Sequence, residues 1–390
     1  MWYFNGHTYD LSKFAKSHPG GKHLIVETNN FDITYLVQCN HNWTKEYAIK
    51  RLESYKVSND KYKKDKADIL WDEKLDRIHE KLTQKNIDIS DLKTPWWGWL
   101  YYCVFGIMYL FFGVKWLIDN EYNVLFGVFG WLWAGFIQHE ASHNALSHNK
   151  HINYLFRYAL IPWSEPEAWF RKHSVLHHQF TNTKLDPDFQ GRENVFVRHH
   201  NSVTYRCGMK FQILTIALYS IVMPFFYNIS YITFIQLGMI SLHYWIHNSI
   251  LGCVSPFIGF GVIFLFITQL NHIQESAISK KILDKPDDFV VHQIKSCINY
   301  SFDNLLISSI SIFLNYQTYH HLFPNVSHFH FLTLREDMDE VIARYNPIQT
   351  CSLVTVIKQY FQYLWKNSFD DKVDTSRRHQ TRIVSDVRVI

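Results

Sequence analysis

The sequence predicts a multi-pass all-α membrane protein, with about four transmembrane helices and cytoplasmic histidine-bearing helices, plus a small α+β domain at the N-terminus. Three observations lead to this fold class. Long apolar segments follow residue 95, histidine clusters stand where those segments end, and residues 1–57 have a mixed, compact composition. Charged residues make up only 19% of the 390 residues, below the roughly 25% of soluble domains. The net charge of +4 gives no reason to expect a nucleic-acid partner.

Residues 1–57 contain two histidines in a pattern typical of haem binding. His18 is followed by Pro-Gly-Gly in "YDLSKFAKSHPGGKHLI", and His41 lies in "FDITYLVQCNHNW". Two imidazoles on opposite sides of a pocket can ligate a haem iron axially and leave no position open for O2. The glycines allow the backbone to approach a porphyrin closely. We therefore expect His18 and His41 to bind haem b in an electron-carrying domain.

Residues 58–94 form a charged segment that we expect to link two domains, beginning with "NDKYKKDKAD". Within this linker, apolar residues recur at helical spacing at Trp71, Leu75, Ile78 and Leu82. The spacing predicts an amphipathic helix that lies on the membrane or on the next domain. A helix packed only on its own neighbours is an equally good interpretation.

We expect a membrane domain at residues 95–345. The run 96–118 is long enough to span a bilayer, and a second apolar run, 122–138, follows after only "DNE". Such a short connection makes a hairpin whose outer ends lie on one side of the membrane. Lys and Arg are frequent before residue 95, which favours the cytoplasm for that side. Residues 346–390 then form a cytoplasmic C-terminal segment.

Three further apolar runs occupy residues 211–272, at about 211–227, 230–247 and 250–270. The later histidine motifs can meet the earlier ones only if this region crosses the membrane an even number of times. One run must therefore lie in the interface. We expect this to be 211–227, which contains Pro224 and follows a polar stretch.

Four histidine clusters lie where segments leave the membrane on the same side. HEASH and HSVLHH contain histidines four residues apart, which share one helix face, and QTYHH repeats the i, i+3, i+4 pattern. NHI follows the last apolar run. Imidazole is a good ligand for iron, copper and zinc, and eight imidazoles suit two metal ions better than one. The candidate ligands are His139, His143, His173, His177, His178, His272, His320 and His321.

We expect other residues near these motifs to have supporting or unrelated positions. His148 is expected beside the ligands or in a structural role. The remaining histidines are expected in the interface (His199, His200), at the far end of a span (His243, His247) and at the surface (His328, His330). Asp186 and Asp188 could orient ligand imidazoles or form an Asx turn around Pro187. Glu140 lies about 100° around the helix from His139, which favours a supporting or solvent-facing position over a catalytic one.

Taken together, HEASH, HSVLHH and QTYHH resemble the histidine boxes of membrane fatty acid desaturases. Residues 2–57 resemble cytochrome b5, and Gln317, in place of the first histidine of the third box, is similar to the front-end desaturases. The resemblance covers nearly the whole chain. It implies a di-iron centre, four spans and insertion of a cis double bond between an existing double bond and the carboxyl end. Gln317 becomes the candidate catalytic residue, as an iron ligand directly or through water.

The resemblance also implies reaction partners and a location. O2 is the co-substrate, and electrons come from NAD(P)H through cytochrome b5 reductase. The acyl chain is carried on CoA or on a phospholipid, and the membrane is the endoplasmic reticulum. The motifs leave the Δ5, Δ6 or Δ8 position open. The alternatives are a sphingolipid desaturase, a b5-fused lipid hydroxylase, and a non-enzymatic haem electron carrier with structural zinc.

Overall fold

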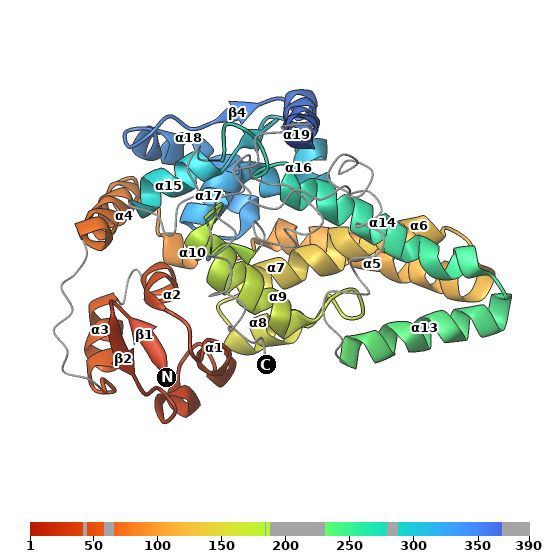
Figure 1. Cartoon of the computed structure of the whole chain (residues 1–390), viewed down its shortest axis with the longest axis horizontal. Coiled ribbons are helices and arrows are strands. Elements are labelled where there is room, and N and C mark those ends of the chain that lie inside the picture. Colours follow the sequence, from red (N-terminus) through yellow and green to blue (C-terminus); the bar gives the residue numbers. More distant parts are fainter. Residues whose placement is uncertain (42–44, 58–65, 184, 188–230, 279–287, 369–390) are drawn as a thin grey trace, which may run out of the picture.

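The computed structural model describes residues 1–41, 45–57, 66–183, 185–187, 231–278 and 288–368. It is mostly helical, with a small α+β domain at the N-terminus followed by a larger helical domain (Figure 1). The predictions for Asp188, His199 and His200 lie outside these ranges. The expected interfacial run 211–227 lies outside them.

The N-terminal domain is a β-hairpin packed on short helices. The hairpin turns at Asn5 and Gly6, whose φ values of 46° and 73° suit the two-residue turn that matches strand twist. Its elements are β1 (Trp2–Phe4), β2 (His7–Tyr9), α1 (Lys22–Glu27), α2 (Thr34–Asn40) and α3 (Lys45–Glu53). Their apolar side chains form a core of their own, which includes Trp2, Tyr9 and Ile25.

Helix α4 (Lys66–Gln84) lies on the larger domain. Leu75, Ile78 and Leu82, which share a helix face, are buried in the main hydrophobic core. The helix packs against α15 and α18 of that domain (Figure 1). Of the interpretations that the sequence left open, the structure therefore supports packing on the next domain. The Trp71 side chain lies outside the described residues.

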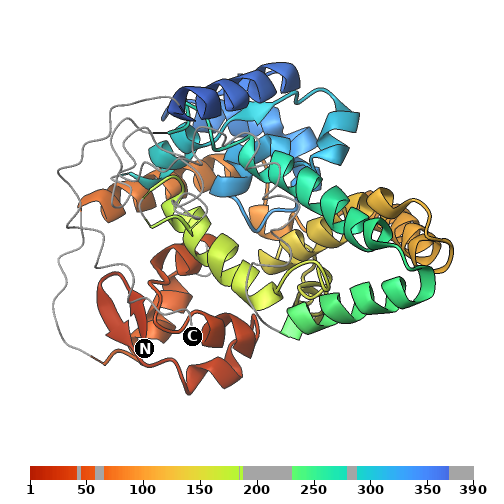
Figure 2. The same ribbon diagram turned by 45° about the vertical axis from the view of Figure 1, so that its right-hand side comes forward.

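A group of helices projects from one end of the larger domain (Figures 1 and 2). They are α5 (Trp96–Asp119), α6 (Asn123–Phe129), α7 (Phe136–Ser142), α13 (Tyr231–His247) and α14 (Ile250–Gln269). Among the described residues, α5 and α14 are long and apolar enough to cross a membrane. The other two expected spans are not confirmed: a π-helical turn over Gly130–Gly135 divides the run at 122–138, and α13 has 17 residues.

Glycines allow α6 and α14 to approach each other closely. A Cβ atom on Gly127 would collide with the Pro256 carbonyl oxygen, and one on Gly259 would collide with the Val124 carbonyl oxygen. Small residues of this kind permit backbone-to-backbone packing where lipid supplies no hydrophobic driving force. Because α6 continues through the π-helical turn into α7, this contact also positions the HEASH segment.

Shorter elements gather at the opposite end of the long helices, around the histidine motifs (Figure 1). They are α8 (Lys150–Phe156), α9 (Pro166–Phe170), a π-helical segment (Arg171–His177), α10 (His178–Phe180), α15 (Phe289–Ser296), β3 (Asn299–Tyr300), α16 (Leu305–Ile310), α17 (Gln317–Leu322), α18 (Phe331–Ile342), β4 (Thr350–Cys351) and α19 (Leu353–Ser368). Buried asparagines connect their loops. Asn182 donates to the carbonyl groups of His272 and Ala277, and Asn271 donates to that of Leu314.

Candidate metal centre and haem site

The eight candidate metal ligands come together in two adjacent groups, and within each group the ligand nitrogens lie within 4.8 Å of one another. The first group consists of His139, His143, His173, His178 and His320, and the second of His177, His272 and His321. The rings of His178 and His321, one from each group, stack with 4.3 Å between their centroids. Two metal ions side by side would suit this arrangement, as the number of histidines predicted.

Sequence neighbours are divided between the two groups. His173 and His177 lie on the π-helical segment, and their rings stack with 5.4 Å between centroids, yet they belong to different groups. The adjacent residues His320 and His321 are divided in the same way. A π-helix has a wider turn than an α-helix and is frequent at functional sites. The four-residue spacing therefore predicted the neighbourhood of these rings, but not which metal position each one faces.

Each ring of the second group is held from behind by a hydrogen bond at Nδ1. The Nδ1 of His177 lies 3.1 Å from both carboxylate oxygens of Asp186, as the sequence suggested. The Nδ1 of His272 lies 2.9 Å from the Ser296 carbonyl oxygen, and that of His321 lies 2.8 Å from the Gln293 Oε1. A proton on Nδ1 leaves the lone pair on Nε2, the nitrogen that can bind a metal ion.

His328 supports His320 in the first group, and the prediction that His328 lies at the surface is wrong. Its side chain is 1% exposed. Its Nδ1 donates to the Ile312 carbonyl oxygen at 3.0 Å, so its Nε2 accepts from His320 Nδ1, also at 3.0 Å. His320 Nε2 then carries a lone pair and faces the group. No spacing rule signals this role, because His328 lies on a separate turn after the QTYHH motif.

Glu140 is fully buried, so the solvent-facing interpretation is wrong. Its carboxylate accepts hydrogen bonds from Ser327 Oγ at 2.6 Å, the His328 backbone N–H at 2.7 Å and Thr94 Oγ1 at 3.2 Å. Burial raises the pKa of Glu140 to about 7, although these donors oppose the shift. The residue fastens the loop that carries His328, which is a supporting role.

Gln317 lies in the second group, at the start of α17. Its side-chain Nε2 is 2.8 Å from His272 Nε2. Its buried Oε1 has no hydrogen-bond partner among the described residues. The group thus consists of three imidazoles and one amide side chain, and an amide oxygen is a possible ligand or water anchor.

The histidine groups have the chemistry that metal ions require. Burial lowers the pKa of His143 to about 3 and those of His178 and His321 well below the ordinary value, so these rings are neutral. Three ring nitrogens of these groups have no hydrogen-bond partner among the described residues: His143 Nε2, His320 Nε2 and His321 Nε2. Leaving such atoms buried and unsatisfied costs about 1–3 kcal/mol each. Bound metal ions would satisfy them, and an all-imidazole set suits iron, copper or zinc.

The N-terminal domain brings His18 and His41 to one cavity of about 350 Å³. Their ring centroids are 6.0 Å apart. His18 Nδ1 donates to the Gly21 carbonyl oxygen at 3.1 Å, which leaves its Nε2 lone pair for a metal. A Cβ on Gly20 would lie 2.9 Å from His18 Cε1, so the glycine makes room for this ring. Apolar side chains from α1 and α2 complete the lining, and the residues fit a bis-histidine haem.

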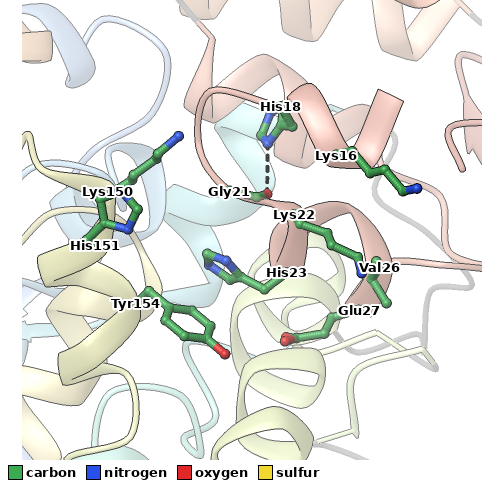
Figure 3. A pocket seen from close by; sticks show the side chains of 10 residues that line it. All are labelled: Lys16, His18, Gly21, Lys22, His23, Val26, Glu27, Lys150, His151 and Tyr154. Carbon is green, nitrogen blue, oxygen red and sulfur yellow. Dashed lines mark hydrogen bonds between the residues drawn. The ribbon is translucent and has the colours of Figure 1, made fainter. Parts of the chain in front are cut away.

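The far wall of the haem cavity belongs to the larger domain. His143 of the first metal group lines it, together with Ser142, Ser147 and His148. Next to it, a second opening of about 430 Å³ lies between α1 and α8 (Figure 3). The haem site and the metal groups are therefore neighbours in space, and His148 lines the haem cavity without belonging to either metal group.

The positions predicted for His243 and His247 agree with the structure, and the position predicted for His330 agrees in part. His243 and His247 donate to the carbonyl groups of Trp116 and Leu117, at the end of α5 away from the metal groups. His330 is half-buried and lies 2.8 Å from the Lys93 carbonyl oxygen, so the surface prediction holds for it only in part.

Two buried histidine groups beside a bis-histidine cavity define a class of protein: a histidine-rich two-metal protein fused to its own electron-carrier domain. Residues 115–352 match the fatty acid desaturase family, and residues 1–64 match the cytochrome b5-like haem/steroid binding domain. The chain belongs to the fatty acid desaturase family, whose members are membrane-bound oxidoreductases.

Known relatives agree with this assignment along most of the chain. A probable Delta(5) fatty acid desaturase C of Dictyostelium discoideum is 23% identical, over 88% of this chain and 86% of its own length. An acyl-lipid (8-3)-desaturase of Mortierella alpina is 24% identical over 84% of each chain. An sn-1 linoleoyl-lipid 6-desaturase of Arthrospira platensis is 24% identical, over 56% of this chain and 69% of its own. No solved structure matches the chain significantly.

Proposed function

We propose that the chain is an O2-dependent front-end desaturase that introduces a cis double bond into an acyl chain, at the Δ5 or Δ6 position. The observation that carries the proposal is the convergence of all eight box histidines into two buried groups, next to a cavity lined by two further histidines. A structural zinc site needs four ligands and no electron donor. The additional ligands and the adjacent haem site favour redox chemistry.

The names of the relatives support a substrate class. Two of the three names specify desaturation at position 5 or 6. Two of them specify an acyl chain carried on a lipid. We infer that this chain acts on a polyunsaturated acyl chain and that a phospholipid carries it. Acyl-CoA is the alternative carrier, and the experiment below distinguishes the two.

In this proposal the five histidines of the first group hold one iron, and His177, His272 and His321 hold the other. Gln317 completes the second position, directly or through a water. The bound irons supply the O2 chemistry that an unactivated methylene requires and that no side chain provides. The chain's own contribution is to fix each imidazole through Asp186 and its other supporting groups and to exclude bulk water by burial.

Electrons would pass from NAD(P)H through cytochrome b5 reductase to a haem held by His18 and His41, and then to the irons. His143 is at once a member of the first metal group and part of the haem cavity wall, so this path is short. The tether at 58–94 keeps the donor domain at high effective concentration.

The topology proposal keeps four crossings. The helices α5 and α14, together with 122–138 and 230–247, would place both metal groups and the haem domain on the cytoplasmic face of the endoplasmic reticulum. Exposed apolar side chains on α5 and α13, such as Leu110 and Trp245, support lipid contact along these helices.

Expression in yeast supplied with linoleic, linolenic or eicosatrienoic acid tests the proposal. We expect new double bonds in the fed acyl chains, first in phospholipids at early times, and none in a His321→Ala control. Early products in the acyl-CoA pool would identify CoA as the carrier. Hydroxylated acyl chains alone would identify a hydroxylase, and products confined to sphingoid bases a sphingolipid desaturase. Zinc without non-haem iron in the purified protein would identify an electron carrier.

A further inference from the structure

Helix α2 of the haem domain contacts both cofactor sites. Its C-terminal cap is the haem ligand candidate His41. Near its start, Tyr35 is 4% exposed and belongs to the hydrophobic core of the larger domain, not to that of its own. The aromatic ring packs against Phe289 of α15 with 5.0 Å between ring centroids. The Tyr35 side chain therefore crosses the domain boundary.

The hydroxyl group of Tyr35 lies next to His178, a member of the first metal group. The hydroxyl oxygen lies 3.5 Å from Nδ1 of His178, at the outer limit of hydrogen bonding. The two rings are nearly parallel, with an interplanar angle of 23°. The opposite nitrogen of His178, Nε2, lies 3.3 Å from His173 Nε2, so it faces the group. Tyr35 thus occupies the position behind His178.

The haem domain is held in this place by further contacts with α8. Glu27 of α1 forms an ion pair with Arg157, whose side chain is 1% exposed. The Arg157 guanidinium also stacks on Phe170, at 3.8 Å from the ring centroid. His23 packs on Tyr154 with 4.6 Å between centroids (Figure 3). A buried arginine that loses its carboxylate partner is costly, so this pair favours the docked position.

We propose that docking of the haem domain completes the metal centre: Tyr35 accepts the Nδ1–H of His178 and fixes the tautomer whose Nε2 faces the other ligands. This inference rests on the proposed di-iron function. Supporting partners for His177, His272, His320 and His321 come from the larger domain. For His178 the partner comes from the electron donor's domain. Tyr35 is therefore a positioning residue, and the metal centre is complete only when its donor is docked.

The test compares full-length Tyr35→Phe protein with the parent and with Tyr47→Phe, a matched control at a 69%-exposed tyrosine of the same domain. Loss of a supporting partner typically lowers metal affinity 10- to 100-fold. We expect iron to leave one position of Tyr35→Phe about 10-fold faster into a ferrous chelator, with haem content unchanged. In the Mössbauer spectrum one iron signal should change and the other should not. Equal release rates in Tyr35→Phe and parent would overturn the proposal.

A second set of variants tests whether docking is the cause. Glu27→Arg should weaken docking and reproduce the faster iron release, and adding Tyr35→Phe to it should have little further effect. The reversed pair Glu27→Arg with Arg157→Glu should restore slow release. Additive effects of Glu27→Arg and Tyr35→Phe would contradict the proposal. The iron content of the parent tests the proposed function separately, because the inference concerns only the ratio between variant and parent.

Discussion

His328 stands directly behind His320, with 3.0 Å between His328 Nε2 and His320 Nδ1. The Ile312 carbonyl oxygen fixes the His328 tautomer from the other side. The orientation and basicity of one candidate metal ligand thus depend on a histidine outside all four motifs. Glu140 in turn holds the backbone of His328, which links the HEASH helix to the third box.

The substitution His328→Phe tests this relationship because it keeps an aromatic ring and removes both nitrogens. We expect iron affinity at the five-histidine position to fall about 10- to 100-fold. Competition with a graded series of chelators would measure it. The matched control is His330→Phe, since His330 is bonded to the Lys93 carbonyl group instead of a metal-group histidine. Undiminished affinity in His328→Phe would show that the hydrogen bond has no supporting role.

The sequence predicted which histidines come together because their signal is local. HEASH and HSVLHH place histidines four residues apart, and QTYHH places Gln317 three and four residues before its two histidines. The His18-Pro-Gly-Gly motif is equally compact. The domain order and helical class follow from the same local patterns. These local patterns predict the structure correctly because helix geometry alone brings such residues together.

The supporting residues could not be predicted in this way. Glu140 meets His328 across 188 positions of sequence, and Tyr35 meets His178 across 143. Such contacts depend on how distant elements dock, which periodicity does not report. The four expected spans are not all confirmed, for a different reason. The π-helical turn at Gly130–Gly135 divides an apolar run that is continuous in hydropathy.

The haem and the irons should be separable by mutation. His41→Ala removes one axial ligand candidate, so we expect loss of the haem absorption spectrum and of turnover with non-haem iron retained. His321→Ala should lower non-haem iron and abolish turnover while the haem spectrum stays intact. Optical spectra and iron-to-haem ratios of the purified variants would measure both. If each variant lost both cofactors equally, the two sites would not be independent.

The metal-free protein should lose stability in mild acid. Desolvation lowers the pKa values of seven histidines at or beside the metal groups: His139, His143, His173, His178, His320, His321 and His328. Because burial disfavours their charged form, stability is fully present above the unfolded value of about 6.5 and falls as pH drops below it. Protonation of each of these histidines on unfolding therefore favours the unfolded state as the pH falls. Glu140, with its pKa raised to about 7, acts in the opposite direction but is a single group.

Thermal unfolding of the metal-free protein between pH 7.5 and 5 would measure this effect. We expect the Tm to fall steadily below pH 6.5. The fall should be shallower in His328→Phe, because this variant lacks the His328 imidazole, whose pKa is lowered to about 4 in the parent. A Tm independent of pH over this range would mean that the histidines are not held neutral by burial.

A substitution at Gly127 would test whether the contact between α6 and α14 positions the candidate metal ligands. A methyl group there would meet the Pro256 carbonyl oxygen, so Gly127→Ala should push the helices apart at a cost of about 1–3 kcal/mol. Since α6 continues into α7, His139 and His143 should shift, and we expect both Tm and non-haem iron content to fall. The control is Gly238→Ala on α13, where nothing lies within 4 Å of an added Cβ and alanine favours the helix. A fall in Tm with full iron content would show that Gly127 serves packing alone. Equal Tm and equal iron content in Gly127→Ala and Gly238→Ala would rule out the close contact itself.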